Sequence, residues 1–420
     1  KIKEKLQNLL KLNRKQGVVP NQIPSSENQV YNLKPAVSVR KFPKILFLLV
    51  IILALLAATV VLLRLKPEGG NLFGKKGEIT WWGIYEDEDI LLPLIEEFEK
   101  NKGVKVKYIK QSTQDYRERL TNTLAGGKGP DIFEYHNTWV PMFVKELDKL
   151  PKSVMTKEEF SKIFYPVINQ DLTIDNSPVG IPLSFDAITL FLNEDIFAKA
   201  AKFPTKRWDE LQRLAAELTQ RPQEIIAVSG VALGTTQNID HWSEILSLIL
   251  LQNGVDPTRP EGKLGENVFR FYLSFSINGV WDEIQPTSTL AFANGKLAMY
   301  LGPTRRATEI VQINPNLRFR TVPPPQIPKD NPDEPDITYA TYWVQGVWAR
   351  SANKDVAWEL LEFLSTRDSM EAIYREKQKR GIVGSPFPRS DMALLQREHE
   401  ILGSVILLAP YAKSSYFAGN

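Results

Sequence analysis

The sequence contains no cysteine and only three histidines, His136, His241 and His399. Without thiols, the chain cannot form disulfides, thiolate metal sites, a cysteine nucleophile or a lipid-modified N-terminal cysteine. The histidines are scattered and show no HExxH spacing, so a histidine-rich zinc site has little support. We therefore expect no bound metal, no cofactor and no catalysis by a metal ion or a thiol.

The globular part of the sequence also lacks a basic patch. Residues 1–66 hold 12 Lys and Arg against Glu4 and Glu27, which leaves 40 basic and 47 acidic residues in the remainder. The net charge of +3 therefore belongs to the N-terminal region. A mildly acidic globular part is not attracted electrostatically to a phosphate backbone, so we expect no nucleic-acid partner. The 420-residue length predicts more than one globular unit.

One long apolar run stands apart from the rest. Residues 45–63 carry no charge and only Thr59 is polar. At about 1.5 Å per residue, this run reaches roughly the ~30 Å of a bilayer core, which predicts a membrane-spanning helix. The cations Arg40, Lys41 and Lys44 precede it, so the N-terminus is expected in the cytoplasm. We predict a disordered cytoplasmic tail at 1–43, an anchor at 44–66, a linker at 67–76 and an extracytoplasmic remainder on a single-pass protein of the cytoplasmic membrane.

Two other interpretations of this run are a cleaved signal peptide and a buried core helix. The small residues Ala54, Ala57 and Ala58 support the signal peptide. A signal peptide usually has an apolar region of about 7 to 15 residues behind a short basic region. Here more than forty residues precede a longer run, which favours the anchor.

The pattern after the linker predicts an α/β fold. Strands are expected at 78–82, 104–109 and 131–135, and amphipathic helices at 90–100 and 115–124 lie between them. This β-α-β-α-β order predicts a parallel sheet with right-handed crossovers. Ligands of such sheets bind beyond the carboxyl ends of the strands, so the loops 83–88 and 136–139 are the first candidates for a site.

Several short phrases in a fixed order resemble family 1 extracellular solute-binding proteins of ABC importers, the group that includes the maltose-binding protein. The resemblance covers about 77–412. The phrases are Gly129-Pro130-Asp131-Ile132, Gly180-Ile181-Pro182, Asn193-Glu194-Asp195, Trp208-Asp209-Glu210-Leu211, the run 291–299 and the helix 357–364.

The resemblance implies a two-lobed periplasmic binding protein type II fold that closes around a ligand. By similarity, lobe one comprises 77–183 and 340–382, and lobe two comprises 184–339 and 383–420. The chain would cross between lobes near Pro182, Tyr339 and Gly384. The family usually continues with further C-terminal helices, so part of lobe two is expected to be missing.

The candidate ligand-binding residues are aromatic, carboxylate and amide side chains, which together suit the C–H faces and hydroxyls of a sugar. The loops after the first and third strands supply Trp82, Tyr85, Glu86, Tyr135, His136, Asn137 and Trp139. Trp81 and Trp82 point to opposite faces of their strand, so one is core and the other is a candidate for the cleft. The resemblance implies that Tyr135 is an aromatic residue on which a sugar ring stacks. The alternative is that Tyr135 is buried under the lobe.

Lobe two and the crossings supply the remaining candidates. By resemblance, Asp186 contacts ligand, with a solvated loop acid as the alternative. Asn238 and Trp242 open a helix and are as consistent with packing as with binding. Thr304 occupies the position of a stacking Trp in the maltose-binding protein. Trp343 and Trp348 lie on one apolar strand, and Trp343 is the candidate because it is nearer to a crossing between the lobes.

Arg305 and Arg306 precede an expected helix, where the helix dipole disfavours cations. This conflict hints at an acidic sugar or a phosphate, and two solvated arginines are the alternative.

The predicted function is the capture of a carbohydrate-like ligand for ABC permease subunits, from an anchor in the lipid bilayer. A receptor of the same fold without a transporter is one alternative. A glycoside hydrolase that uses Glu86 and Asp186 is a second, which nothing around these residues requires.

Overall fold

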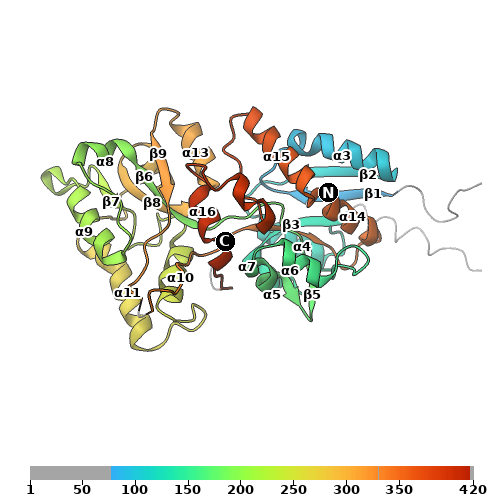
Figure 1. The fold of residues 1–420 in the computed structure, drawn as a ribbon, viewed down its shortest axis with the longest axis horizontal. Coiled ribbons are helices and arrows are strands. Elements are labelled where there is room, and N and C mark those ends of the chain that lie inside the picture. Colours follow the sequence, from blue (N-terminus) through green and yellow to red (C-terminus); the bar gives the residue numbers. More distant parts are fainter. Residues whose placement is uncertain (1–76, 330, 417–420) are drawn as a thin grey trace, which may run out of the picture. The chain divides into compact units, whose positions relative to one another are not determined.

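The computed structural model describes residues 77–329 and 331–416, which form two α/β lobes (Figure 1). The predicted tail, anchor helix and linker lie outside the described residues. Within the described ranges, no helix is both long and apolar enough to cross a membrane.

The first lobe contains a four-stranded sheet in the order β10-β3-β1-β2. β1 (Glu78–Gly83) is parallel to β2 (Lys105–Lys110) and to β3 (Ile132–His136), and β10 (Trp343–Val347) lies antiparallel beside β3. The predicted β-α-β-α-β order is present. The strand order reverses at β1, so the carboxyl ends of β1 and β3 form the position where such sheets bind ligands.

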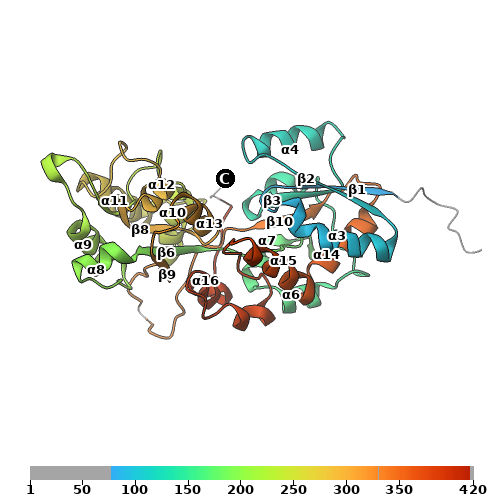
Figure 2. The ribbon, with the colours of Figure 1, turned by 90° about the horizontal axis from the view of Figure 1, so that it is seen from above.

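The helices of the first lobe cover both faces of this sheet. α3 (Glu88–Lys102) buries Ile90, Leu91, Leu94 and Phe98 along one stripe and ends at Gly103, whose φ of 68° suits glycine. α4 (Tyr116–Ala125) lies on the opposite face (Figure 2), as right-handed crossovers on either side of β1 require. The other elements are α5 (Val140–Phe143), α6 (Lys157–Ile163), α7 (Pro166–Leu172), β4 (Thr173–Ile174), β5 (Ser177–Pro178), α14 (Lys354–Leu364) and α15 (Arg367–Lys379).

The second lobe contains a four-stranded sheet in the order β7-β8-β6-β9. Its strands are β6 (Ile188–Asn193), β7 (Ser229–Val231), β8 (Leu297–Pro303) and β9 (Phe319–Val322). β6 and β8 are buried along their whole length, which explains their continuous apolar sequence. The helices are α8 (Glu194–Ala200), α9 (Trp208–Leu218), α10 (Trp242–Gln252), α11 (Gly262–Ile277), α12 (Ser288–Ala293) and α13 (Arg306–Ile313).

Two neighbouring chain segments connect the lobes. Ala187 belongs to the first core and Ile188 to the second, and the chain returns between Tyr339 and Ala340. The two segments pair antiparallel, and the backbone N–H of Ile188 donates to the carbonyl of Tyr339 at 2.9 Å. This pairing places these two connections side by side between the sheets.

The C-terminal segment contributes to both cores. It contains the helix α16 (Gly403–Leu408), flanked by 3-10 turns at Ser390–Leu395 and Ala409–Tyr411. Phe387, Met392 and Val405 pack in the first core, whereas Ile401 and Leu402 pack in the second. The segment expected in lobe two therefore shares its apolar side chains between the lobes.

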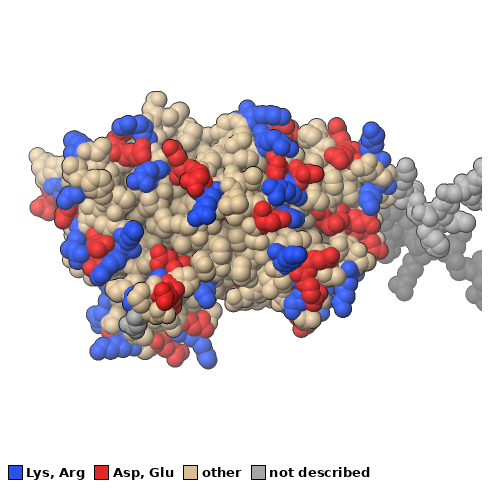
Figure 3. Space-filling view, in the orientation of Figure 1, with Lys and Arg blue, Asp and Glu red and all other residues tan. Residues whose placement is uncertain are grey.

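The face of the molecule in Figure 3 shows acidic and basic side chains intermingled, with no continuous basic stripe. This distribution gives that face no particular attraction for a polyanion.

Candidate functional site

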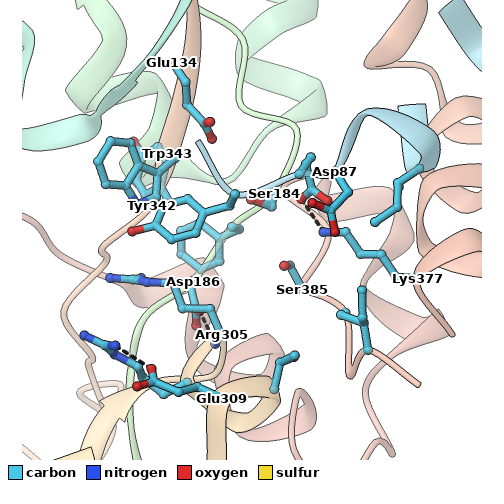
Figure 4. A pocket seen from close by; sticks show the side chains of 18 of the residues that line it. Asp87, Glu134, Ser184, Asp186, Arg305, Glu309, Tyr342, Trp343, Lys377 and Ser385 are labelled. Atoms are coloured by element: carbon cyan, nitrogen blue, oxygen red, sulfur yellow. Dashed lines mark hydrogen bonds and ion pairs between the residues drawn. The ribbon is translucent and has the colours of Figure 1, made fainter. Parts of the chain in front are cut away.

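A cavity of about 320 Å³ lies between the lobes, where the connecting segments meet the carboxyl ends of the first-lobe strands. We call it the interlobe cavity (Figure 4). The first lobe lines it with Tyr85, Glu86, Asp87, Ile90, Lys110, Glu134, Trp343 and Lys377, and the second lobe with Arg305, Arg306, Thr308, Glu309 and Gln312. The segments between the lobes add Ser184, Phe185, Asp186, Thr341, Tyr342, Ile382, Gly384 and Ser385.

Two ion pairs form the charged wall of the first lobe. Glu86 pairs with Lys377 of α15, and Asp87 pairs with Lys110 at 2.5 Å at the end of β2. Lys377 is only 7% exposed, and the carboxylate of Glu86 beside it compensates for the burial of a charged side chain. Paired carboxylates and ammonium groups present acceptors and donors at fixed positions, which is the arrangement that a polyhydroxylated ligand requires.

Aromatic rings form the second component of this wall. The Trp343 ring packs edge-on against the rings of Tyr85, His136 and Trp139, with centroids 5.2 to 5.3 Å apart. These contacts fix the Trp343 ring, whereas Tyr85 is 45% exposed. Tyr85 is therefore the aromatic face that the cavity offers most openly to a ligand.

Glu134 lies at the base of the cavity on β3 and is 6% exposed. Its Oε2 accepts a hydrogen bond from the backbone N–H of Ile84 at 2.6 Å. Burial raises the pKa of Glu134 to about 7, and the nearby charge of Glu86 acts in the same direction. The Glu134 side chain therefore stays protonated to a higher pH in the folded protein than an exposed glutamate does.

Replacement of Glu134 by Gln should change how stability depends on pH. The folded-state pKa of Glu134 lies above its ordinary value of 4.5. The contribution of this side chain to the free energy of unfolding is therefore full below pH 4.5 and is lost as pH rises through about 7. Relative to Glu134→Gln, the wild type should lose up to about 3 kcal/mol of unfolding free energy across that window. The buried imidazoles of His136 and His241 have lowered pKa values and act oppositely, so the difference between the two proteins is the informative quantity.

Urea unfolding at half-unit pH steps from 4.5 to 8 measures this difference. Glu96→Gln, an exposed change on α3, is the control and should show no such trend. A constant difference between wild type and Glu134→Gln across the range would contradict the raised pKa.

The second-lobe wall is the start of α13, and Asp186 holds it in place. Asp186 Oδ1 accepts from the backbone N–H and the hydroxyl of Thr304, at 2.8 and 2.9 Å, and Oδ2 accepts from the backbone N–H of Arg305 at 2.8 Å. A carboxylate in this position satisfies N–H groups before the helix and offsets the positive end of its dipole. The neighbouring arginines are thereby tolerated at a helix start.

A buried chain of polar groups orients the second arginine of this wall. Arg306 Nε donates to Nε2 of His241 at 3.0 Å, and His241 Nδ1 lies 3.2 Å from Glu244 Oε1. A guanidinium cannot accept a hydrogen bond, so His241 Nε2 carries no proton and Nδ1 donates to Glu244. Burial opposes ionisation of Glu244, but the bonds from His241 and Ser243 lower its pKa to about 2.

Four of the predicted site residues line the interlobe cavity: Tyr85, Glu86, Asp186 and Trp343. Trp139 lines a neighbouring hollow of about 340 Å³ that also contains Tyr85 and Trp343. The loop after β1 therefore contributes to the cavity as expected for the end of a parallel strand.

The other predicted residues are engaged elsewhere. Tyr135 and His136 are fully buried, and their side chains contact Val179 and the hydroxyls of Thr138 and Thr341. Asn137, Asn238 and Thr304 are buried and bonded within the protein, to Asp171, to Asp282 and to Asp186 respectively. Trp82 and Trp242 pack against the two cores. Of the tryptophan pair, Trp81 is the core residue, and its Nε1 donates to Gln345 at 2.8 Å.

Several cavity residues were not predicted as site residues, chiefly Asp87, Lys110, Glu134, Tyr342 and Lys377. Asp87 lies in the predicted loop 83–88 and Lys110 directly follows the predicted strand 104–109, so the rule for parallel sheets could have identified them. Lys377 lies near the end of a helix far along the chain, and no local pattern indicates that it reaches the loop after β1. No cluster of metal-binding side chains occurs among the described residues.

Comparison with known proteins identifies the family. Residues 85–371 match the model of the bacterial extracellular solute-binding protein family. A binding protein of Brucella abortus is 23% identical over 293 residues, covering 66% of this chain and 69% of that protein. The diacetylchitobiose binding protein of Streptomyces coelicolor is 22% identical over 322 residues, covering 71% of each chain.

Solved structures share the fold. An ABC transporter solute binding protein from Thermotoga lettingae, bound with alpha-D-tagatose, has a TM-score of 0.65 and 21% identity, covering 81% of this chain and 88% of that chain. The family resemblance inferred from the sequence is confirmed. The chain belongs to the bacterial extracellular solute-binding protein family.

Proposed function

We propose that this protein captures a carbohydrate between its two lobes and delivers it to an ABC importer. The observation that carries the proposal is the interlobe cavity, where aromatic rings and paired charges from both lobes line one space. Such a lining combines apolar faces for sugar C–H groups with fixed hydrogen-bonding groups for hydroxyls. The names of the related proteins, which include binders of diacetylchitobiose and alpha-D-tagatose, support the same ligand class.

The proposed mechanism is ligand-stabilised closure. A ligand that contacts both α13 and the loop after β1 gains more interactions when the lobes approach, so it shifts the population toward a closed form. The closed form would then be the form that docks on the permease. We further propose that residues 45–63 anchor the protein outside the cytoplasmic membrane, because this uncharged run is long enough to span a bilayer.

The geometry argues against the hydrolase alternative. Asp186 uses both oxygens to bind backbone groups before α13, and Glu86 pairs with Lys377. A glycoside hydrolase needs one carboxyl group to donate a proton and a second to act as base or nucleophile. Neither residue is free for such a role.

A thermal-shift screen of the full chain tests the proposal. The probes are diacetylchitobiose, maltose, mannobiose, tagatose and sugar acids, with putrescine, a tripeptide and inorganic phosphate as non-sugar solutes. We expect the melting temperature to rise with sugar concentration, by an amount equivalent to about 2.7 kcal/mol at a ligand concentration 100 times Kd. A shift with only the amine, the peptide or the phosphate would overturn the carbohydrate assignment.

Tyr85→Ala should weaken sugar binding by roughly 5- to 20-fold, because it removes the exposed ring of the cavity wall. Tyr411→Ala is the matched control, since Tyr411 is 49% exposed and does not line the cavity. Isothermal titration with the sugar that gives the largest shift measures both variants. Equal affinity in the two variants would show that the ligand does not use this wall.

A further inference from the structure

The interlobe cavity contains four cationic side chains, and three of them have a carboxylate partner. The pairs are Lys110–Asp87, Lys377–Glu86 and Arg306–Glu309. Arg305 forms no ion pair with any residue in the described ranges, although it lines the same cavity. The cavity therefore has one guanidinium whose charge no directly bonded carboxylate balances.

Most of the hydrogen-bond donors of the Arg305 side chain have no acceptor within the described residues. Its Nη1 donates to the carbonyl of Thr341 at 3.2 Å, and this is its single side-chain hydrogen bond within 77–329 and 331–416. A guanidinium has five N–H donors arranged as a planar fork. The side chain is half-buried, so solvent reaches only part of it. Figure 4 shows Arg305 beside Tyr342 and Asp186, on the side of the cavity opposite Lys377.

Asp186 lies near this guanidinium but does not bond to it. Its two oxygens accept hydrogen bonds from the backbone groups of Ala187, Thr304 and Arg305 and from the Thr304 hydroxyl. Arg306, the next residue, adds a second positive charge at the positive end of α13. An additional negative charge in front of Arg305 would be stabilised by both arginines.

The charge balance selects a carboxylate over a phosphate. The N–H groups of Thr304 and Arg305, which could bind a phosphate at a helix start, are already bonded to Asp186. Glu309 and Asp186 also lie on this wall and would repel a dianion. One free guanidinium fork matches one carboxylate, which it can bind through two parallel hydrogen bonds.

We propose that the ligand is an acidic sugar, of the uronic acid class, whose carboxylate binds the free guanidinium of Arg305. The inference rests on the proposed function, because the sugar ring would occupy the space between Arg305 and the first-lobe wall. In this arrangement the carboxylate connects the ligand to α13, and the ring meets Tyr85 and the charged pairs of the first lobe.

Isothermal titration of the full chain with matched sugars tests the proposal. The acidic probes are galacturonic acid, glucuronic acid and the disaccharides of each. The neutral probes are galactose, glucose and the disaccharides of each, and glucose 6-phosphate is the phosphate probe. The acid should bind roughly 10- to 100-fold tighter than its neutral partner, as expected for a hydrogen bond between charged groups. The preference should fall as salt rises from 20 to 500 mM.

Arg305→Gln should remove most of that preference, so that an acidic sugar and its neutral partner bind this variant with similar affinity. Arg305→Lys keeps the positive charge but loses the planar guanidinium, so it should retain part of the preference for acidic sugars. Arg270→Gln, an exposed change on α11, is the control and should keep the full preference. Circular dichroism and the melting temperature without ligand show whether each variant folds.

The outcomes separate the two proposals. If neutral sugars bind as tightly as acids and Arg305→Gln changes nothing, the acidic-sugar inference is wrong and the carbohydrate function stands. If glucose 6-phosphate is the preferred probe, the carboxylate assignment is wrong. If no sugar binds while an amine or a peptide does, the proposed function itself fails.

Discussion

Asp186→Ala should lower the free energy of unfolding by about 3 kcal/mol or more, even without a ligand. The change leaves the backbone N–H groups of Ala187, Thr304 and Arg305 and the Thr304 hydroxyl without their acceptor in a buried place. Each unsatisfied buried group costs about 1–3 kcal/mol. Loss of the carboxylate also removes the negative charge nearest Arg305 at the positive end of α13, whereas Arg306 keeps its ion pair with Glu309. Urea unfolding of the ligand-free protein measures the loss.

Two further variants isolate the cause. Asp186→Asn keeps one acceptor oxygen, so it should cost less than Asp186→Ala. Asp195→Ala removes an exposed acid of α8 that pairs with Arg318, and it should change stability little. If Asp186→Ala abolished sugar binding but left the unfolding midpoint unchanged, Asp186 would be a direct ligand contact, as the family resemblance implies, and not the support of α13.

Asp171→Ala should also destabilise the protein strongly, by about 2–4 kcal/mol. The Asp171 carboxylate accepts hydrogen bonds from Asn137 Nδ2 at 2.9 Å, from the Tyr342 hydroxyl at 2.8 Å and from the Ser414 hydroxyl. It is 4% exposed, so these donors would lose their partner away from water. The bonds join α7, the loop after β3, the segment before β10 and the C-terminal segment.

The distinctive readout for Asp171→Ala is the release of the C-terminal segment. Lys413 is exposed and lies next to Ser414, so trypsin should cleave after Lys413 faster in the variant. Asp195→Ala again serves as the control. Equal cleavage rates in Asp171→Ala and wild type would show that Asp171 does not hold this segment.

The sequence predicts the secondary structure of the first lobe well, because each element has a local cause. Apolar spacing gives α3 and α14, and the Gly126–Pro130 break separates α4 from β3. The order of strands and helices then requires a parallel sheet with ligand-binding loops at its carboxyl edge. This local reasoning is sufficient to place Tyr85 and Glu86 at the ligand-binding edge, and both line the interlobe cavity.

The sequence predicts individual site residues less well on the central strand β3. Both faces of β3 are covered, so all five of its residues are buried, including Tyr135 and His136. The alternation of apolar and polar residues along a strand distinguishes buried from exposed side chains only when one face of the sheet is exposed to solvent. The one β3 side chain that lines the cavity is Glu134, which no aromatic or amide pattern indicates.

By itself, the sequence determined the fold class, the order of the elements and the family, because periodicity, turn residues and short phrases are local properties. Tertiary structure alone decided which charges meet. Lys377 balances Glu86 across 291 residues, and Asp186 supports α13 from 118 residues away, whereas Arg305 forms no ion pair within the described residues. The physical reason is that a charge in a partly buried place is tolerated only through its neighbours in space, and the chain order does not specify those neighbours.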